Sequence, residues 1–528
     1  MAVAPSSTTA STSTAPPAPP TVVTAEANRV IWLLLVAAFV AILNETTMGV
    51  AIPHLIADFQ ITAVAAQWLT TAFMLTMAVV IPITGFLLQR LTTRAVFTAA
   101  MSLFSTGTLI AVLAPGFEFL LVARVVQASG TAIMMPLLMT TLMTVVPPHA
   151  RGRMMGRVSI VMSLAPAIGP TLSGFLLDTL SWRWIFAVVL PIALISLAIG
   201  VRWIHNLGET RRAPLDVLSV VLSAFGFGGL VFGLSQIGAG GHGGGDAAAA
   251  APASNLPLII ALTVGVLSLG AFVWRQLALQ RSDEALLDLR VFRSANFSLS
   301  VAQLAVMSMA FFGAITLLPL YMQNVLGLSA LESGLIVLPG SLAMGIAGPF
   351  IGRIYDRWGT RVLLVPGAVI VTGILWTFTT LTENTSVWLL LSLQTLLSLG
   401  LAMSFTPLFT ASLGSLQPRF YSYGSAIVST VQQVAGAAGI ALLITVMAAA
   451  EAGAIEPGTT AAGAAGARAA FLVAAIIASP LIIGAFLIRK PAVSPEEAYR
   501  PLTLNAALVW GLEEAAAMDA HLRGIANS

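Results

Sequence analysis

The chain has 528 residues, of which 58% are hydrophobic and 9% are charged, and its formal net charge is +3. Soluble domains carry charge on about a quarter of their residues, so this composition excludes a soluble protein and predicts an all-α polytopic membrane protein. The basic residues lie in short clusters between apolar segments and form no continuous basic stripe, which argues against a nucleic-acid partner.

Missing residue types exclude two further classes of site. The sequence has no cysteine, and its five histidines are widely separated, so we expect no disulfide and no metal site. It also lacks the G-x-x-x-x-G-K-[ST] string with which many ATPases hold phosphate. We therefore expect no ATP and no other cofactor, and any uphill transport would draw on an ion gradient or on a separate subunit.

The order of segments along the chain is simple. Residues 1–28 are rich in Ser, Thr, Ala and Pro, which predicts a disordered tail. Apolar segments follow, each long enough to cross a bilayer as a helix of about 20 residues. The predicted segments are 30–52, 67–88, 95–114, 119–146, 157–178, 184–204, 215–237, 256–279, 297–322, 331–354, 361–381, 387–411, 424–450 and 468–489. In the tail at 491–528, Leu504, Leu508 and Leu512 have the spacing of a short amphipathic helix.

Basic residues mark one side of the membrane. They gather in alternate connections between the apolar segments, and few lie in the other connections. Such asymmetry places the basic connections in the cytoplasm. The sequence therefore predicts a multi-pass protein of the cell (cytoplasmic) membrane with both termini in the cytoplasm, which an even number of segments allows.

Glu45 is an ionisable residue inside the first apolar segment, where it costs several kcal/mol unless it is neutralised or paired. With its neighbour Asn44 it forms a polar patch, which predicts contact with protein or a water-filled cavity. Arg124 in the fourth segment is predicted at the same depth, so the two charges are a candidate pair that takes up and releases a proton. Alternatively, Glu45 is protonated and only fixes helix packing. Other candidate membrane acids are Asp178, Asp216 and Glu332.

An internal repeat divides the chain. GFLLQRLTTR after the second segment aligns without a gap with GRIYDRWGTR after the tenth, which predicts two related six-helix bundles with an extra helix pair between them. The aligned positions include Gly85 with Gly352, Arg90 with Arg357 and Arg94 with Arg361. The predicted domains are a tail at 1–28, a six-helix bundle at 29–206, a two-helix insertion with a Gly/Ala-rich outer loop at 207–282, a six-helix bundle at 283–490 and a tail at 491–528.

Several motifs resemble those of one transporter family. The pattern G-x-x-x-D-R-x-G-x-R in the second repeat resembles the cytoplasmic loop signature of the major facilitator superfamily. ARVVQASG resembles that superfamily's fourth-helix motif, and APAIGPTLSG resembles the fifth-helix motif of its antiporters. LNETTMGVAIP is similar to the first-helix motif of the fourteen-helix drug:proton antiporter family, in the branch that includes lincomycin-type resistance pumps. Three positions depart from the family pattern. Asn44 and Gln89 stand where aspartates are usual, and Val189 stands where an asparagine is usual before Pro191.

The resemblance implies a major facilitator fold of two six-helix bundles plus two extra transmembrane helices. It further implies a secondary active transporter, namely a proton-coupled multidrug efflux antiporter that exports amphipathic or cationic drugs or antibiotics by alternating access. The resemblance also implies a monomer, whose partners are protons, small amphipathic molecules and the lipid bilayer. The implied sites are a proton-coupling and substrate site at Glu45, Asn44, Arg124 and Gln127, an inner-loop gate at Gly85, Arg90, Arg94, Gly352, Asp356, Arg357, Gly359 and Arg361, and an antiporter helix motif at Gly169, Pro170 and Gly174.

Two alternative functions stay open at this stage. The same machine would export a lipid, a siderophore or an endogenous metabolite equally well. A polytopic membrane enzyme is disfavoured because the sequence shows no H-E-x-x-H motif, no paired carboxylates and no Ser-His arrangement.

Overall fold

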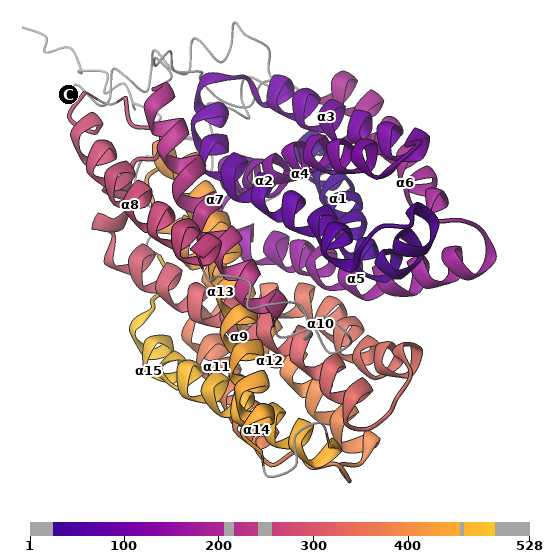
Figure 1. Ribbon diagram of the computed structural model, residues 1–528. Helices are drawn as coiled ribbons and strands as arrows, with labels where there is room; N and C mark the ends of the chain where they lie inside the picture. The colour runs from indigo at the N-terminus through magenta and orange to yellow at the C-terminus, as the bar shows by residue number, and fades with distance from the viewer. Residues whose placement is uncertain (1–24, 205–215, 241–255, 283, 455–458, 492–528) are drawn as a thin grey trace, which may run out of the picture. The chain divides into compact units, whose positions relative to one another are not determined.

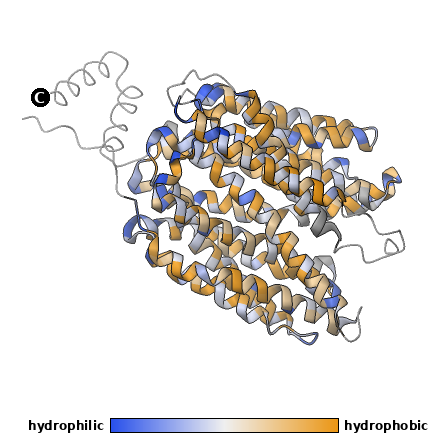
Figure 2. Ribbon diagram, turned by 60° about the vertical axis from the view of Figure 1, so that its left-hand side comes forward, coloured by the Kyte–Doolittle hydropathy of each residue, from blue (hydrophilic) through white to orange (hydrophobic). Residues whose placement is uncertain are grey.

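The computed structural model describes residues 25–204, 216–240, 256–282, 284–454 and 459–491 (Figure 1). The Gly/Ala-rich loop after the seventh segment and the amphipathic helix predicted in the C-terminal tail lie outside these residues. In the described part, fourteen helical spans are long and apolar enough to cross a membrane, which confirms the predicted all-α fold. Hydrophobic residues cover these helices, and hydrophilic residues gather toward their ends (Figure 2).

The helices fall into two halves and an inserted pair. The N-terminal half contains α1 (Ala25–Phe59), α2 (Ala63–Arg90), α3 (Thr93–Leu113), α4 (Phe117–Val145), α5 (Arg151–Thr179) and α6 (Arg183–Trp203). The inserted pair is α7 (Val217–Gly240) and α8 (Leu256–Leu279). The C-terminal half contains α9 (Ala295–Asn324), α10 (Ala330–Trp358), α11 (Arg361–Phe378), α12 (Val387–Gly414), α13 (Tyr421–Ala452), α14 (Thr460–Ala478) and α15 (Pro480–Leu487). The short 3-10 helices η1 (Pro148–Ala150), η3 (Leu289–Arg293) and η4 (Pro418–Phe420) precede α5, α9 and α13.

Packing follows these halves. In the N-terminal half α4 packs against α2 and α3, and α5 packs against α1; in the C-terminal half α13 packs against α9, and α12 against α10. The halves meet mainly where α5 contacts α10 and where α2 contacts α13. Once the inserted pair is left out, α2 corresponds to α10 and α5 to α13, so the two contacts are equivalent under the internal repeat.

The first helix is longer than the apolar pattern predicts. The segment predicted at 30–52 is part of α1, which runs from Ala25 to Phe59. Its last turn is fixed by Asp58, which accepts a hydrogen bond from the Trp182 indole at 2.7 Å and lies 3.9 Å from the Arg183 guanidinium. Because these contacts satisfy a polar helix end, α1 continues beyond the point at which its apolar residues stop.

The inserted pair packs between the halves and on itself. α7 contacts α2 and α13, one helix from each half, while α8 packs mainly against α7. Small residues allow the two inserted helices to approach closely, since a Cβ added at Gly229 would lie 2.9 Å from the Cα of Gly265. Near the start of α7 and the end of α8, Arg275 donates to Asp216 at 2.6 and 2.9 Å.

Candidate functional site

Arg124 is the centre of a buried polar cluster in the N-terminal half. Its side chain is only 1% exposed. One terminal nitrogen donates to the Asn44 amide oxygen at 3.2 Å and to the Gln127 amide oxygen at 3.0 Å, and Nε donates to the Leu69 carbonyl at 3.4 Å. The guanidinium carbon also lies 4.0 Å from the centre of the Phe73 ring. Neutral acceptors therefore hold the guanidinium, and none of the described acids forms a hydrogen bond with it.

Gln127 is itself held in place by the neighbouring helix. Its amide nitrogen donates to the Thr108 hydroxyl at 2.9 Å. α3 and α4 come unusually close at this level, because a Cβ added at Gly107 would lie 2.6 Å from the backbone nitrogen of Gln127. This close packing orients the amide oxygen of Gln127 toward Arg124.

Glu45 lies beside this cluster but does not bond to it. The carboxylate is partly buried on α1 and feels the charge of Arg124. Among the described residues, however, Arg124 donates to the adjacent Asn44 and not to Glu45. The Asn44 amide nitrogen is buried and has no hydrogen-bond partner in the same residues. Glu45 is thus an acid in the field of a buried cation, without a fixed partner of its own.

The fifth helix packs against α1 at the turn that carries Glu45. A Cβ added at Gly169 would collide with the Thr46 hydroxyl, and Ser173 donates to the Thr47 carbonyl at 3.0 Å. Gly169 therefore allows the close helix approach that the motif predicts. Pro170 also lies within α5, but its side chain is outside the described set, and Gly174 has no neighbouring atom within 4 Å of an added Cβ.

The second loop signature joins the two halves at the end of the molecule that carries the arginine clusters. Asp356, near the end of α10, accepts hydrogen bonds from the backbone nitrogens of Gly152 at 2.8 Å and Arg153 at 2.9 Å. These nitrogens belong to the first turn of α5, where the helix dipole favours a negative charge. Gly352, one turn before Asp356, packs directly on the Gly152 carbonyl, and Gly359 ends α10 with a φ of 83°.

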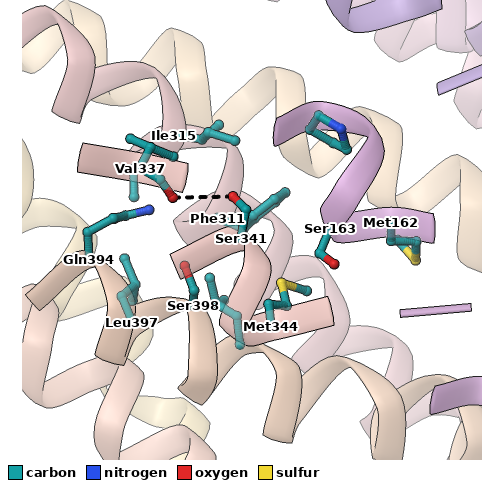
Figure 3. A pocket seen from close by; sticks show the side chains of 13 residues that line it. Met162, Ser163, Phe311, Ile315, Val337, Ser341, Met344, Gln394, Leu397 and Ser398 are labelled. Atoms are coloured by element: carbon teal, nitrogen blue, oxygen red, sulfur yellow. Dashed lines mark hydrogen bonds between the residues drawn. The ribbon is translucent and has the colours of Figure 1, made fainter. Parts of the chain in front are cut away.

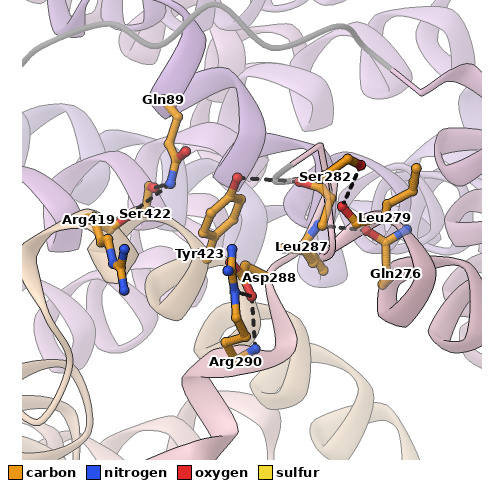
Figure 4. A network of polar contacts seen from close by, with 11 residues as sticks. Gln89, Gln276, Leu279, Ser282, Leu287, Asp288, Arg290, Arg419, Ser422 and Tyr423 are labelled. Atoms are coloured by element: carbon orange, nitrogen blue, oxygen red, sulfur yellow. Dashed lines mark hydrogen bonds and ion pairs between the residues drawn. The ribbon is translucent and has the colours of Figure 1, made fainter.

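The first loop signature makes the equivalent contact with different chemistry. Gln89 aligns with Asp356, and its amide nitrogen donates to the Arg419 carbonyl and the Ser422 hydroxyl, both at 3.0 Å (Figure 4). One turn earlier, a Cβ added at Gly85 would lie 3.0 Å from the Ala426 Cβ. The groups that bind Gln89 lie at the start of α13, and the groups that bind Asp356 lie at the start of α5. The two contacts are therefore equivalent under the internal repeat.

The sequence reasoning identified the two loops but missed the helix starts that receive them. A signal was available, because each receiving helix follows a short 3-10 helix that begins with proline, at Pro148 and Pro418. The strings PHARG and PRFYS at these places share only the leading proline, so the common feature is the proline before each helix.

Four arginines of the predicted gate point away from it. Arg90 and Arg357 are exposed and lie over the rings of the nearby residues Phe86 and Trp358, at 5.9 and 5.2 Å from the ring centres. Arg94 and Arg361 are also exposed, in the first turns of α3 and α11. The structure therefore does not bring these side chains to the contacts made by Gln89 and Asp356.

Two of the other candidate acids have hydrogen-bond partners of their own among the described residues. A hydrogen bond from Arg275 lowers the pKa of Asp216, just before the α7 span, to about 2, against an opposing effect of burial. Asp216 therefore stays ionised near neutral pH. Glu332 and Ser329 form a capping box at the start of α10. The side chain of Asp178 lies outside the described set, and no group of three or more potential metal ligands occurs within that set.

A pocket lies between the halves, formed by α5, α9, α10 and α12 (Figure 3). It holds about 440 Å³ of empty space, counting the part that opens to solvent. Most of its lining is apolar, and in the described chain no residue that lines it is charged. Its polar side chains are Ser163, Ser341, Gln394 and Ser398, and its larger apolar ones include Met162, Phe311 and Met344. This pocket could not be located from the sequence, because helix tilt decides which side chains meet there.

The family follows from comparison with known proteins. The model of the Major Facilitator Superfamily matches residues 34–440. The chain belongs to this superfamily. It is 41% identical over 462 residues to the MFS-type transporter YcnB of Bacillus subtilis, covering 88% of this chain and 95% of the relative. It is 38% identical over 465 residues to the lincomycin resistance protein LmrB of the same organism, covering 87% and 95%. These relatives confirm the resemblance to the superfamily's lincomycin-resistance-like branch.

Solved structures agree on the fold. The human organic anion transporter MFSD10 superposes with a TM-score of 0.60 at 16% identity, covering 88% of this chain and 99% of that protein. The proton:xylose symporter XylE superposes with a TM-score of 0.57 at 12% identity, covering 86% and 95%. With the family match, the chain is a multi-pass membrane transporter of small molecules, and these superpositions show the major facilitator fold.

Proposed function

We propose that this major facilitator protein is a proton-coupled antiporter that exports drugs or antibiotics from the cytoplasm by alternating access. Support for drugs comes from the relatives named lincomycin resistance protein, and from a multidrug resistance protein B homolog of Mycobacterium tuberculosis that is 30% identical over 417 residues. Support for proton coupling comes from one observation above all. Buried Arg124 is held by neutral groups, and Glu45 lies in its field without a hydrogen-bond partner among the residues that the structure describes.

This arrangement suits a group that exchanges protons. The proton affinity of a carboxylate depends on its distance from a neighbouring cation and on its contact with water. A shift of α1 relative to α4 therefore alters the affinity of Glu45 for a proton. A cationic substrate that approaches Glu45 competes for the same negative charge. Proton uptake and substrate release are then linked without any further group.

The contacts between the halves support a state that is closed at one end. Hydrogen bonds accepted by Asp356 and donated by Gln89 cross between the halves at the arginine-bearing end, and the Thr140 and Ser425 hydroxyl oxygens lie 2.7 Å apart nearby. By the positive-inside rule this end faces the cytoplasm, as do both termini. An impermeant thiol reagent should therefore label Glu383→Cys, at the opposite end, in intact cells; labelling only after lysis would contradict this orientation.

The Glu45→Gln substitution tests the coupling. Purified protein in liposomes should exchange lincomycin for protons under an imposed pH gradient, and Glu45→Gln should lower this exchange to the rate of empty liposomes. The amide keeps the size of the side chain but cannot titrate, so the variant should still fold and bind. Glu118→Gln, on the same helix as Arg124, is the matched control and should retain the wild-type rate.

Two results would change the proposal. Wild-type exchange by Glu45→Gln would make Glu45 a packing residue and move the coupling to another group. Absence of pH-driven movement of lincomycin and ethidium by the wild type would favour a lipid, a siderophore or an endogenous metabolite as the exported compound.

A further inference from the structure

A connecting segment after the inserted pair is buried, although it belongs to no transmembrane helix. Residues 284–288 follow α8 and precede η3. Within this segment Ala285, Leu286, Leu287 and Asp288 are each at most 4% exposed. Connections between helices normally lie on the surface, because a buried loop must find partners for its backbone N–H and C=O groups. The partners of this segment therefore show to which part of the molecule it is attached.

Gln276 joins the segment to both helices of the inserted pair. It lies in α8 and is fully buried, with 0% exposure. Its amide nitrogen donates to the Ser219 hydroxyl on α7 at 2.7 Å. Its amide oxygen accepts a hydrogen bond from the Leu287 backbone nitrogen at 3.1 Å (Figure 4). One buried amide thus connects α7, α8 and the segment.

On its other side the segment is attached to the C-terminal half. The Tyr423 hydroxyl on α13 donates to the Ala285 carbonyl at 3.3 Å. Asp288 caps η3 by accepting a hydrogen bond from the Arg290 backbone nitrogen at 2.9 Å. The Arg290 guanidinium carbon lies 5.8 Å from the centre of the Phe420 ring, directly before α13. These contacts hold the segment against the start of α13.

Toward the N-terminal half the segment presents an apolar side chain. A Cβ added at Gly85 on α2 would lie 3.4 Å from the Leu287 Cδ2, which is an ordinary van der Waals distance. Among the described residues, no hydrogen bond joins the segment, α7 or α8 to α2. The inserted pair is therefore hydrogen-bonded, through the segment, to the C-terminal half and only packed against α2.

We propose that residues 284–288 make the inserted pair a part of the C-terminal half, and that Gln276 is the positioning residue that holds the two together. The inference takes from the proposed function only that the halves move relative to each other. During this movement α7 and α8 keep their distances from the C-terminal half, while their distances from the N-terminal half change. Leu287 then leaves Gly85 when the arginine-bearing end opens, so the inserted pair contributes a contact to the closed state.

Distances between spin labels on the full-length protein test the assignment, in lipid nanodiscs without substrate or pH gradient. Leu277→Cys labels α8, Val362→Cys labels the C-terminal half and Leu91→Cys labels the N-terminal half. All three side chains are exposed, and the chain has no native cysteine. Double variants that carry two of these cysteines give the three distances by pulsed EPR. The Leu277–Val362 distance should have one narrow distribution, whereas the Leu277–Leu91 distribution should be as broad as that of Leu91–Val362.

Gln276→Leu removes the connection and keeps a side chain that suits a buried position. It should raise the population of displaced Leu277–Val362 distances roughly tenfold, the effect of one lost buried hydrogen bond. Tyr423→Phe deletes only the hydroxyl that binds the segment and should displace the same distance in the same direction. Gln280→Leu is the matched control and should change nothing, because the Gln280 amide nitrogen has no hydrogen-bond partner among the described residues.

Two results would overturn the assignment. One is a Leu277–Val362 distribution that stays unchanged in Gln276→Leu and in Tyr423→Phe; the second of these variants decides alone if the first does not fold. The other is a wild-type protein in which the Leu277–Leu91 distance is fixed and the Leu277–Val362 distance varies. A fixed Leu91–Val362 distance would instead contradict alternating access, and the two variants would still decide the attachment. Because neither substrate nor gradient is present, these results are separate from a failure of drug export in liposomes.

Discussion

At the scale of single residues, the Arg124 cluster shows how neutral hydrogen-bond acceptors hold a buried guanidinium in a membrane protein. The planar guanidinium reaches the Asn44 and Gln127 side chains and the Leu69 carbonyl in different directions. A lysine ammonium is more compact and cannot present the same fork of donors. The cluster therefore depends on the shape of arginine as well as on its charge.

Arg124→Lys should accordingly destabilise the protein while keeping the charge. At least one of the buried acceptors would lose its donor, at a cost of roughly 1–3 kcal/mol. Thermal unfolding of the purified protein, followed by intrinsic fluorescence, measures the loss. Arg94→Lys is the control, because Arg94 is exposed at the start of α3. An unfolding temperature for Arg124→Lys equal to that of the wild type would show that charge alone matters.

Only part of this cluster could be predicted from the sequence. Helical rise along α1 and α4 predicted that Glu45 and Arg124 lie at one depth, and Asn44 indeed bonds to Arg124. Which of Asn44 and Glu45 faces the guanidinium depends on the rotation of α1, and adjacent residues differ by about 100° around a helix. That rotation is set by packing, including the contact of Gly169 with Thr46, and no local pattern encodes it.

At the scale of elements, α5 and α10 form a seam of small residues that ends at the pocket. Gly152 packs on Gly352 and Gly156 on Gly348, in each case with backbone against backbone. Farther along, Ser163 and Ser341 line the pocket, where the two helices leave room between them. The halves therefore close tightly at the arginine-bearing end and enclose space beyond it.

Gly352→Ala should force α5 and α10 apart where their small residues are packed together. An added Cβ would collide with the Gly152 carbonyl, which belongs to a helix backbone and cannot move aside alone. We expect at least a tenfold lower rate of lincomycin exchange in liposomes, with ordinary expression, because the closed arrangement becomes inaccessible. Gly373→Ala on α11 is the matched control, since no atom lies within 4 Å of its added Cβ. Equal rates for the two variants would mean that the seam opens too little to matter in transport.

At the scale of the whole molecule, the two docking loops of the internal repeat make contacts of unequal strength. A carboxylate at the start of α5 carries a full charge, whereas Gln89 at the start of α13 makes neutral hydrogen bonds. Charge-assisted hydrogen bonds are roughly twice as strong as neutral ones. Sequence alone shows the replacement at position 89, but it does not show which backbone groups receive each side chain.

Asp356→Asn should therefore shift the balance of conformations. Removing the charge weakens two hydrogen bonds that join the halves, and we expect the population open at the arginine-bearing end to rise roughly tenfold. Spin labels on Leu91→Cys and Val362→Cys, both exposed near this end, report the distance, and the chain has no native cysteine to interfere. Glu383→Gln, at the other end, should leave the distance distribution unchanged. An unaltered distribution in Asp356→Asn would show that the α5 contact does not hold this end closed.

The position of α7 has a mechanical consequence under the proposed alternating access, in which the two halves move relative to each other. Because α7 touches both α2 and α13, one of these surfaces must slide when the halves move. Its surface toward α2 is smooth and apolar, with Gly228 beside Leu75 and Val79, and Phe232 stacked on Trp68 at 5.7 Å between ring centres. Such contacts contain no hydrogen bonds that must break, so α7 can slide along α2 at little cost in free energy. A bulky compound bound between α7 and α2 would therefore slow this movement and inhibit transport without entering the pocket between the halves.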